Sequence, residues 1–234
     1  MRKQCWIRAA LLVMVGILIA CLPRSDSQIA KTDEAQKSEL HLPYTLPAPS
    51  LQGSLSLEEV LAWRRSVRQF TEEALTLEEV GQILWAAQGI TSAAGQRTAP
   101  SAGALYPLEV YVVTEEGAFH YVPEDHQLVI QRKGEVQAEL YQAALRQEAV
   151  REAPAVFVIA AVYARTSQKY GEERSPRYVH LEAGHAAQNI LLQAVSLGLG
   201  GVPIGAFEDE KVLEVLDLPA DQQPLYLIPV GHPR

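Results

Sequence analysis

Apolar and polar residues alternate after position 50 in patterns that predict a series of short helices and strands. Helical spacing recurs over five segments: Leu57–Arg65, Thr76–Gln88, Glu135–Gln147, His180–Leu197 and Glu208–Leu216. Thr76 and Glu79 have the spacing of a capping box, and Gly89 is the expected end of that helix. The fourth segment is apolar around much of its circumference, which predicts burial on most sides and favours a subunit interface.

Five further segments have the length and composition of strands: Leu108–Thr114, Ala118–Val122, Leu128–Gln131, Ala155–Val162 and Leu225–Val230. Ala155–Val162 is continuously apolar, so we expect it to be a buried central strand. Glu116-Gly117 predicts a turn, after which the sheet continues antiparallel. A polar stretch, Arg165–Arg177, is interpreted as a loop. Helices interleaved with an antiparallel hairpin predict an α+β fold rather than a doubly wound parallel sheet.

The N-terminus has the pattern of an export signal. Basic residues precede a 12-residue apolar run, Ala9–Ala20, which is shorter than the roughly 20 residues of a spanning helix. The run ends in Leu-Ile-Ala-Cys, which resembles a bacterial lipobox and implies that Cys21 is lipidated. We therefore expect a membrane-anchored protein outside the cytoplasm. An uncleaved anchor helix, or an ordinary signal followed by an unrelated cysteine, remains the alternative.

These patterns divide the chain into a signal peptide (1–20), a proline-containing polar tether (21–50) and one folded domain (51–234). Removal of residues 1–20 changes the net charge from −8 to −11, so electrostatic attraction to anionic lipid would not hold the protein at a membrane. The same acidity, with no basic block in the domain, argues against nucleic acid as a partner. Both cysteines, Cys5 and Cys21, precede the domain, which excludes a disulfide framework and a thiol nucleophile within it.

Four sequence motifs stand out in the domain. They are Arg64–Phe70 (RRSVRQF), Ala99–Pro107 (APSAGALYP), Glu182–Asn189 (EAGHAAQN), and Gly198–Gly205 (GLGGVPIG) followed by Pro229–Pro233 (PVGHP). In this order and spacing they resemble the nitroreductase superfamily over about residues 55–233. The sequence PSAGALYP resembles the corresponding motif of its SagB/ThcOx branch, which includes azoline oxidases of peptide natural-product pathways. The resemblance implies a nitroreductase-like fold, an FMN cofactor, and an intertwined homodimer whose flavin sites are shared between subunits.

The arginine motif suits the phosphate end of FMN, because guanidinium groups form bidentate, charge-assisted bonds with phosphate. The resemblance implies that Arg64 and Ser66, in a cluster with Arg65, serve the phosphate and ribityl chain. It places Arg68 near N1 and O2 of the ring, where positive charge stabilises the reduced flavin. A solvated basic helix end is the structural alternative.

The other expected cofactor contacts come from backbone-rich segments. The resemblance implies that the partner subunit supplies Pro100, Ser101, Ala102, Gly103 and Leu105, and that Gly205 and Ala206 belong to the loop that meets flavin N5 and O4. Many relatives have a further Lys or Arg beyond the last strand, where this chain has Arg234. An ordinary turn and a helix C-cap are the alternatives for the two loops.

Lys169-Tyr170 resembles the Lys-Tyr pair that acts as base in azoline oxidases, with a surface loop pair as the alternative. Tyr106 and Arg97 are further candidates for the pocket. His180 and His185 are five residues apart, so they do not share a helix face, and we expect no metal site. No G-x-G-x-x-G motif follows a strand, so NAD(P)H is expected only as a transient co-substrate.

The sequence thus predicts an FMN-dependent oxidoreductase that transfers hydride between a donor such as NAD(P)H and a small organic substrate. Two alternatives stay open. One is a SagB/ThcOx-like dehydrogenase whose flavin is re-oxidised by O2. The other is a cell-surface binding lipoprotein that has lost flavin.

Overall fold

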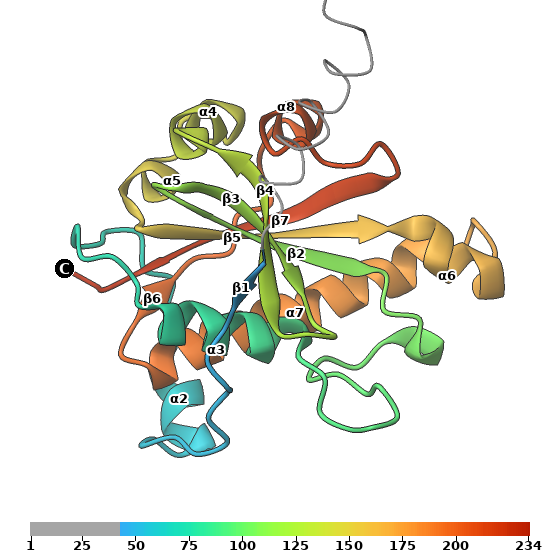
Figure 1. The fold of residues 1–234 in the computed structure, drawn as a ribbon, viewed down its shortest axis with the longest axis horizontal. Coiled ribbons are helices and arrows are strands. Elements are labelled where there is room, and N and C mark those ends of the chain that lie inside the picture. Colours follow the sequence, from blue (N-terminus) through green and yellow to red (C-terminus); the bar gives the residue numbers. More distant parts are fainter. Residues whose placement is uncertain (1–42) are drawn as a thin grey trace, which may run out of the picture. The chain divides into compact units, whose positions relative to one another are not determined.

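The structure is a computed structural model that describes residues 43–234. A seven-stranded sheet organises this part of the chain (Figure 1). Its order is β1-β4-β3-β2-β5-β7-β6, and every neighbouring pair is antiparallel. The strands are β1 (Tyr44–Thr45), β2 (Leu108–Thr114), β3 (Gly117–Val122), β4 (Gln127–Lys133), β5 (Ala155–Val162), β6 (Gly200–Gly201) and β7 (Gln222–Gly231). The predicted α+β class and antiparallel hairpin are confirmed.

Strand β5 lies at the centre of the sheet and all eight of its residues are buried. It pairs with β2 on one side and β7 on the other. Alternate side chains face opposite layers: Phe157 packs into one hydrophobic cluster and Val158 into the other. Burial on both faces explains why this segment is uniformly apolar instead of alternating.

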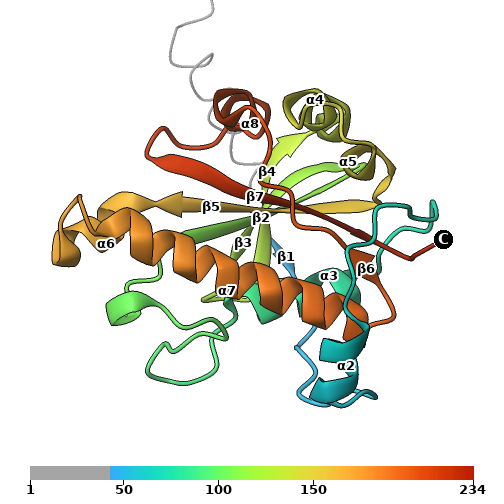
Figure 2. The ribbon, with the colours of Figure 1, turned by 180° about the vertical axis from the view of Figure 1, so that it is seen from behind.

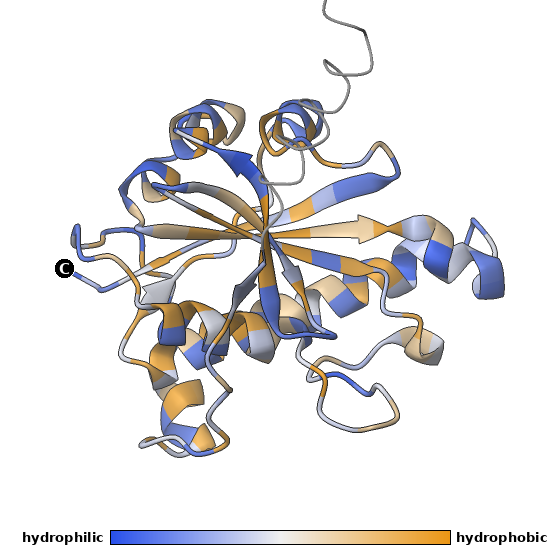
Figure 3. Ribbon diagram, viewed as in Figure 1, coloured by the Kyte–Doolittle hydropathy of each residue, from blue (hydrophilic) through white to orange (hydrophobic). Residues whose placement is uncertain are grey.

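Helices cover both faces of the sheet (Figures 1 and 2). They are α2 (Leu57–Trp63), α3 (Leu77–Gln88), α4 (Val136–Ala143), α5 (Glu148–Glu152), α6 (Tyr163–Tyr170), α7 (Ser175–Ser196) and α8 (Asp209–Val215), with a short 3₁₀ turn, η1 (Ala102–Ala104). Helices α3 and α7 share one cluster with the sheet, and α4, α5 and α8 share the other. Colouring by hydropathy shows apolar residues concentrated along the central strands between these layers (Figure 3).

Helix α7 is buried along one face rather than on most sides. Ala183, Ala186 and Ile190 pack into the core, whereas Leu181 on the opposite face is 54% exposed. The predicted burial is therefore wrong for the single chain. The subunit interface inferred from it stays a prediction.

The predicted helix Glu135–Gln147 is too long. Helix α4 ends at Ala143, and Leu145 and Arg146 both adopt left-handed backbone conformations, with φ of 56° and 58°. Two such residues in succession turn the chain out of the helix, and α5 begins at Glu148. No glycine or proline marks this break in the sequence.

The polar stretch Arg165–Arg177 is not a loop. It contains most of α6, which ends before Gly171 (φ 77°), and the first residues of α7. Helix α7 starts at Ser175 with Pro176 in its first turn, where a missing backbone N–H costs nothing. Of the residues of α6, Thr166 is buried, so the helix packs through one narrow face and its sequence stays polar.

The predicted tether overlaps the folded unit at its C-terminal end. Tyr44 and Thr45 pair with β4, Leu46 is only 4% exposed, and Pro47 O accepts a hydrogen bond from the His126 ring. The expected signal, lipobox and most of the tether lie outside the described residues. Among the helices of residues 43–234, none has the length and apolar character to cross a bilayer.

The capping box of α3 is present. Thr76 Oγ1 accepts a hydrogen bond from Glu79 N at 3.2 Å, and Thr76 N donates to Glu79 Oε2 at 2.7 Å. We predict that Thr76→Ala lowers the free energy of unfolding by about 1 kcal/mol, because backbone donors of the first turn lose their acceptor. Urea denaturation measures the effect. Thr76→Ser is the control and keeps near wild-type stability; equal losses for both variants would contradict the cap.

Candidate functional site

The arginine motif lies beside the sheet edge formed by β6. Helix α2 ends at Trp63, and the chain then runs parallel to β6, with Ser66 opposite Gly201 and Val67 N donating to Gly201 O at 3.0 Å. A Cβ on Gly200 would lie 2.6 Å from Val67 Cγ2. The Gly200-Gly201 pair therefore allows the motif to approach the sheet closely.

The guanidinium groups of this motif have no carboxylate partner among residues 43–234. Arg64 is half-buried, whereas Arg65 and Arg68 are exposed. Arg65 Nη1 donates to two backbone oxygens, Ala62 O at 2.9 Å and Arg64 O at 2.7 Å. None of the three is within ion-pair distance of a described acidic residue, although the chain has a net charge of −8. Arg64 and Arg68 thus offer uncompensated positive charge, which fits a phosphate dianion.

The C-terminal segment passes alongside the arginine motif. Thr71 N donates to His232 O at 2.9 Å, and Arg234 N lies 3.3 Å from Gln69 O. The backbone of Arg234 is therefore next to the motif. Its guanidinium instead lies 3.9 Å from Glu152 Oε2. A role for this side chain at the phosphate requires it to leave that weak ion pair.

The second group of candidates is the loop from Pro100 to Leu105, where the backbone is strained. Gly103, Ala104 and Tyr106 all have positive φ, at 66°, 53° and 45°. Ser101 Oγ accepts a hydrogen bond from Tyr106 N at 2.9 Å, which closes the loop around η1. Ala102 and Leu105 are half-buried, and Pro100 and Gly103 are exposed. Left-handed non-glycine residues are costly, and such clusters are typical of binding and catalytic loops.

The structure brings Lys169 and Tyr170 against this loop. A Cβ on Gly103 would lie 2.8 Å from Lys169 Nζ and 2.9 Å from Tyr170 OH. Both residues belong to the last turn of α6, so their predicted position in a loop is wrong. The Tyr170 ring also packs on that of Tyr178, with centroids 4.7 Å apart.

Three residues without an assigned role hold the loop in place. Arg165 Nη1 donates to Tyr106 O at 3.1 Å and pairs with Glu109. Asn189 Nδ2 donates to Ala86 O at 3.0 Å and lies 3.4 Å from Thr98 O. Asn189 is the last residue of the third sequence motif. This residue of the motif therefore supports the segment that leads into the loop.

Arg97 and Tyr106, the two additional pocket candidates, contact each other beside the loop. The Arg97 guanidinium lies 4.8 Å from the centre of the Tyr106 ring and donates to Gln88 Oε1 at 3.2 Å. Beneath them lies Glu182, which is 2% exposed. Burial raises the pKa of Glu182 to about 7, against hydrogen bonding by Ser101 and the charge of Arg97, which lower it. No sequence pattern predicts a role for this carboxyl group.

The remaining candidates follow β6. Val202 N donates to Pro229 O at 3.2 Å and Ile204 pairs with Leu227, which fixes the course of this loop along β7. Gly205 and Ala206 are exposed, and a Cβ on Gly205 would meet nothing within 4 Å. Ala206 O accepts a hydrogen bond from Gln147 Nε2 at 2.7 Å, which leaves the backbone N–H groups of this pair to meet a ligand.

The arginine motif and the Ser101 loop lie toward opposite ends of α7 (Figure 2). Tyr178, which contacts Tyr170, is near the start of this helix, and Ser196 ends it just before β6. Ser101 itself lies beside Glu182, and the stretch of α7 from Glu182 to Ser196 is about 21 Å long at about 1.5 Å per residue. The two groups of candidates are therefore well separated within one chain.

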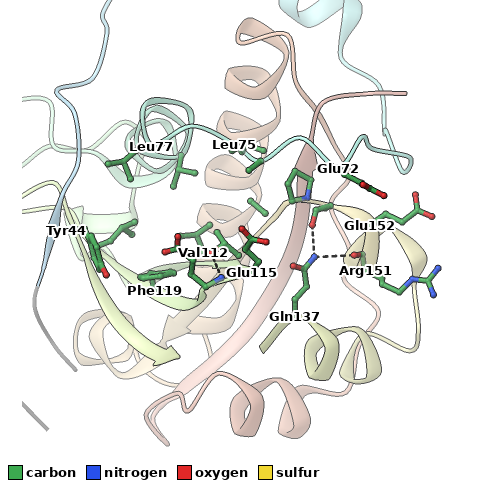
Figure 4. A pocket seen from close by; sticks show the side chains of 18 residues that line it. Tyr44, Glu72, Leu75, Leu77, Val112, Glu115, Phe119, Gln137, Arg151 and Glu152 are labelled. Atoms are coloured by element: carbon green, nitrogen blue, oxygen red, sulfur yellow. Dashed lines mark hydrogen bonds between the residues drawn. The ribbon is translucent and has the colours of Figure 1, made fainter. Parts of the chain in front are cut away.

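A cavity of about 440 Å³ opens elsewhere, between α3, α5 and the ends of β2 and β3 (Figure 4). Leu75, Val112 and Phe119 form apolar walls, and Glu72 and Glu152 lie near its mouth. It contains none of the predicted cofactor residues. This cavity and the candidate site therefore do not coincide.

Fold and site together define an α+β protein with an antiparallel sheet, an uncompensated arginine motif, and a strained glycine-containing loop backed by a Lys-Tyr pair. The sequence model of the Nitroreductase family matches residues 61–232. The chain belongs to the nitroreductase family.

Known proteins support this assignment. A predicted nitroreductase of Methanocaldococcus jannaschii is 49% identical over 184 residues, which cover 76% of this chain and 91% of that protein. The FMN reductase (NADPH) of Bacillus subtilis is 28% identical over 190 residues, or 75% of this chain and 65% of that protein. The crystal structure of a predicted nitroreductase of Ralstonia eutropha has a TM-score of 0.75 at 29% identity, covering 82% of this chain and 90% of that chain.

The contact at Gly103 leads to a prediction with a matched control. Gly103 and Gly95 both have positive φ, at 66° and 79°, but a Cβ on Gly95 would meet no atom within 4 Å. We predict that either glycine-to-alanine change lowers the free energy of unfolding by about 1–2 kcal/mol through backbone strain. Only Gly103→Ala also displaces Lys169, because the flexible side chain yields to the new methyl group.

Urea denaturation measures the first effect, and acylation of Lys169 followed by mass spectrometry measures the second. Lys169 labelling should change in Gly103→Ala and stay at the wild-type rate in Gly95→Ala. Identical labelling in both variants would contradict the contact.

Proposed function

We propose that the chain is an FMN-dependent oxidoreductase that takes hydride from NAD(P)H and passes the electrons to a small organic substrate. The observation that carries this proposal is the pair Arg64 and Arg68, which have no carboxylate partner among the described residues of an acidic chain. Nitroreductase-family membership and similarity to an FMN reductase support it.

Bound FMN would supply the hydride-accepting ring, on which negative charge builds up during reduction. Arg64, with Ser66, would hold the phosphate through charge-assisted hydrogen bonds. Arg68, four residues further along the same extended segment, would place a fixed positive charge at the ring and favour its reduced form. Gly205 and Ala206, which are exposed, would present backbone N–H groups to the ring.

The working unit in this proposal is a homodimer with two shared sites. The stretch of α7 from Glu182 to Ser196, about 21 Å at about 1.5 Å per residue, keeps the Ser101 loop away from the arginine motif of the same chain. A second copy, related by a two-fold axis, would bring its own loop to that motif, and the exchange would be reciprocal. Exposed apolar residues on α2 and α7, Leu57, Leu61, Trp63 and Leu181, give a surface that such a copy would cover.

A second candidate function is a SagB/ThcOx-like dehydrogenase that oxidises its substrate and passes electrons to O2. The contact of Lys169 and Tyr170 with Gly103 favours it, because it places an amine and a phenol beside the expected flavin loop. There the pair would move a proton while the ring exchanges hydride.

We further propose that lipidation at Cys21 anchors the enzyme outside the cytoplasm. The proposal rests on the lipobox-like sequence alone, which lies outside the described residues. Metabolic labelling with a palmitate analogue, with Cys21→Ser as the comparison, tests it.

The two arginines should separate by function. We predict that Arg64→Ala weakens FMN binding by roughly tenfold to a hundredfold, the loss of about 1.5–3 kcal/mol of charged hydrogen bonds. Arg68→Ala should weaken binding less, but lower the flavin potential and slow reduction by NAD(P)H. Fluorescence titration of FMN and anaerobic titration with NADH and NADPH measure the two effects.

Arg146→Ala is the control, because this arginine is exposed in the turn after α4, away from the motif. Small and equal effects of the Arg64 and Arg68 changes would remove the assigned roles. A yellow protein that neither NADH nor NADPH bleaches would favour the dehydrogenase, and a protein that takes up no FMN would overturn both functions.

Sharing of the site can be tested by complementation. We predict that Arg64→Ala and Gly103→Asp homodimers bind FMN poorly, whereas the heterodimer of the two binds about half the wild-type amount, because one of its two sites is intact. Two different affinity tags allow the heterodimer to be purified, and its flavin content is read from absorbance.

The matched control is the heterodimer of Arg64→Ala with Arg64→Glu. Both changes then affect the same half of the site, so neither site is intact and binding is not restored. Recovery in this control, or no recovery in the test pair, would contradict a shared site.

A further inference from the structure

Glu182 is the buried acid closest to the expected flavin loop. It lies on α7, is 2% exposed, and has Ser101, Gln88 and Arg97 around its carboxyl group. Gln88 is fully buried as well. Burial disfavours the charged form of this carboxyl group, and the charge of Arg97 offsets that effect only in part.

Two polar atoms in this group have no hydrogen-bond partner among the described residues. Glu182 Oε1 and Gln88 Nε2 are both buried and unpaired. The amide oxygen of Gln88 already accepts from Arg97 Nη1 at 3.2 Å, which turns its amide nitrogen away from that arginine. The carboxyl group is thus incompletely satisfied, and its environment accommodates a neutral acid at little cost.

The hydrogen bonding of Ser101 depends on the protonation of this acid. Ser101 Oγ accepts from Tyr106 N at 2.9 Å, so its own proton remains free to be donated. An ionised Glu182 attracts that proton inward. A protonated Glu182 donates to Ser101 Oγ, and the serine proton turns outward to the loop surface.

We propose that Glu182 is a positioning residue that sets the direction of the Ser101 hydroxyl toward the flavin, so that reduction of the cofactor is accompanied by proton uptake at Glu182. The inference rests on the proposed function, in which the Ser101 loop meets the cofactor. The hydride donor supplies both electrons, and solvent supplies the proton. The outward O–H of Ser101 then faces the negative charge that develops on the ring. This interaction couples proton uptake at Glu182 to reduction of the cofactor.

The charges around Glu182 allow it to titrate near neutral pH. Burial raises its pKa to about 7, and Arg97 is the charged group whose field lowers it. Arg97 is itself paired with Glu124 at 3.0 Å, which weakens that field. Lys169 and Tyr170 meet the same loop at Gly103, on the side of α6, and the only other ionisable group of the loop is the Tyr106 phenol.

The test compares wild type with Glu182→Gln, Ser101→Ala and the exposed control Glu173→Gln. In wild type, the midpoint potential of bound FMN should change slope with pH near the pKa of Glu182. Both Glu182→Gln and Ser101→Ala should lose this change, because one removes the proton and the other removes the hydroxyl that transmits it. Glu173→Gln should keep it.

A second measurement needs no cofactor. The unfolded chain has an ordinary glutamate pKa, so the folded protein binds the Glu182 proton more tightly. The stability of flavin-free protein should therefore fall as pH rises from the ordinary glutamate pKa of 4.5 through about 7, and this fall should be smaller in Glu182→Gln.

The outcomes distinguish failure of the Glu182 coupling from failure of the proposed function. If FMN binds and the Glu182→Gln potential follows the wild-type pH profile, the coupling is overturned and the proposed function stands. If flavin-free protein shows the Glu182 titration but takes up no FMN, both are overturned. Loss of the slope change in Glu182→Gln and Ser101→Ala, with Glu173→Gln unchanged, supports the coupling.

Discussion

The packing of α7 on the sheet is the constraint on which the rest of this molecule depends. Small residues such as Ala183 and Ala186 let the helix lie close to the strands, and Ile190 fills the core between them. A long helix held this tightly behaves as a rigid spacer, since its rise per residue is fixed. Loops attached near its two ends keep a constant separation. The chain cannot bring its arginine motif to its own Ser101 loop by a local movement.

The regular elements of the fold could be predicted where burial leaves a simple pattern. Strands β2 and β5 have the predicted bounds, because β5 is uninterrupted apolar and β2 is rich in Val and Tyr with one acidic residue, Glu109. Helix α3 was recognisable from the Thr76 and Glu79 cap. The break at Leu145 and Arg146 left no sign, since left-handed residues outside glycine are chosen by tertiary packing. Helix α6 was missed because one buried threonine is too weak a pattern to distinguish it from a loop.

The candidate site, like the fold, could be predicted from the sequence only in part. The arginine and PSAG motifs were visible because the resemblance is carried by contiguous residues. What supports them is distant in sequence: Asn189 holds Thr98, and Arg165 holds Tyr106. The contact of Gly103 with Lys169 joins residues that no local pattern relates. Glu182 stood inside a recognised motif, but its chemistry comes from burial beneath a loop, which a linear sequence does not report.

The two ends of α7 differ in electrostatics as well as in position. At one end, the exposed Arg65 and Arg68 provide positive charge. At the other, a buried glutamate is poised to gain or lose a proton near neutral pH. In a shared site, the permanent charge would come from one chain and the titratable group from its partner. The redox behaviour of the cofactor would then follow pH through a group that belongs to a different chain from the arginines that bind its phosphate.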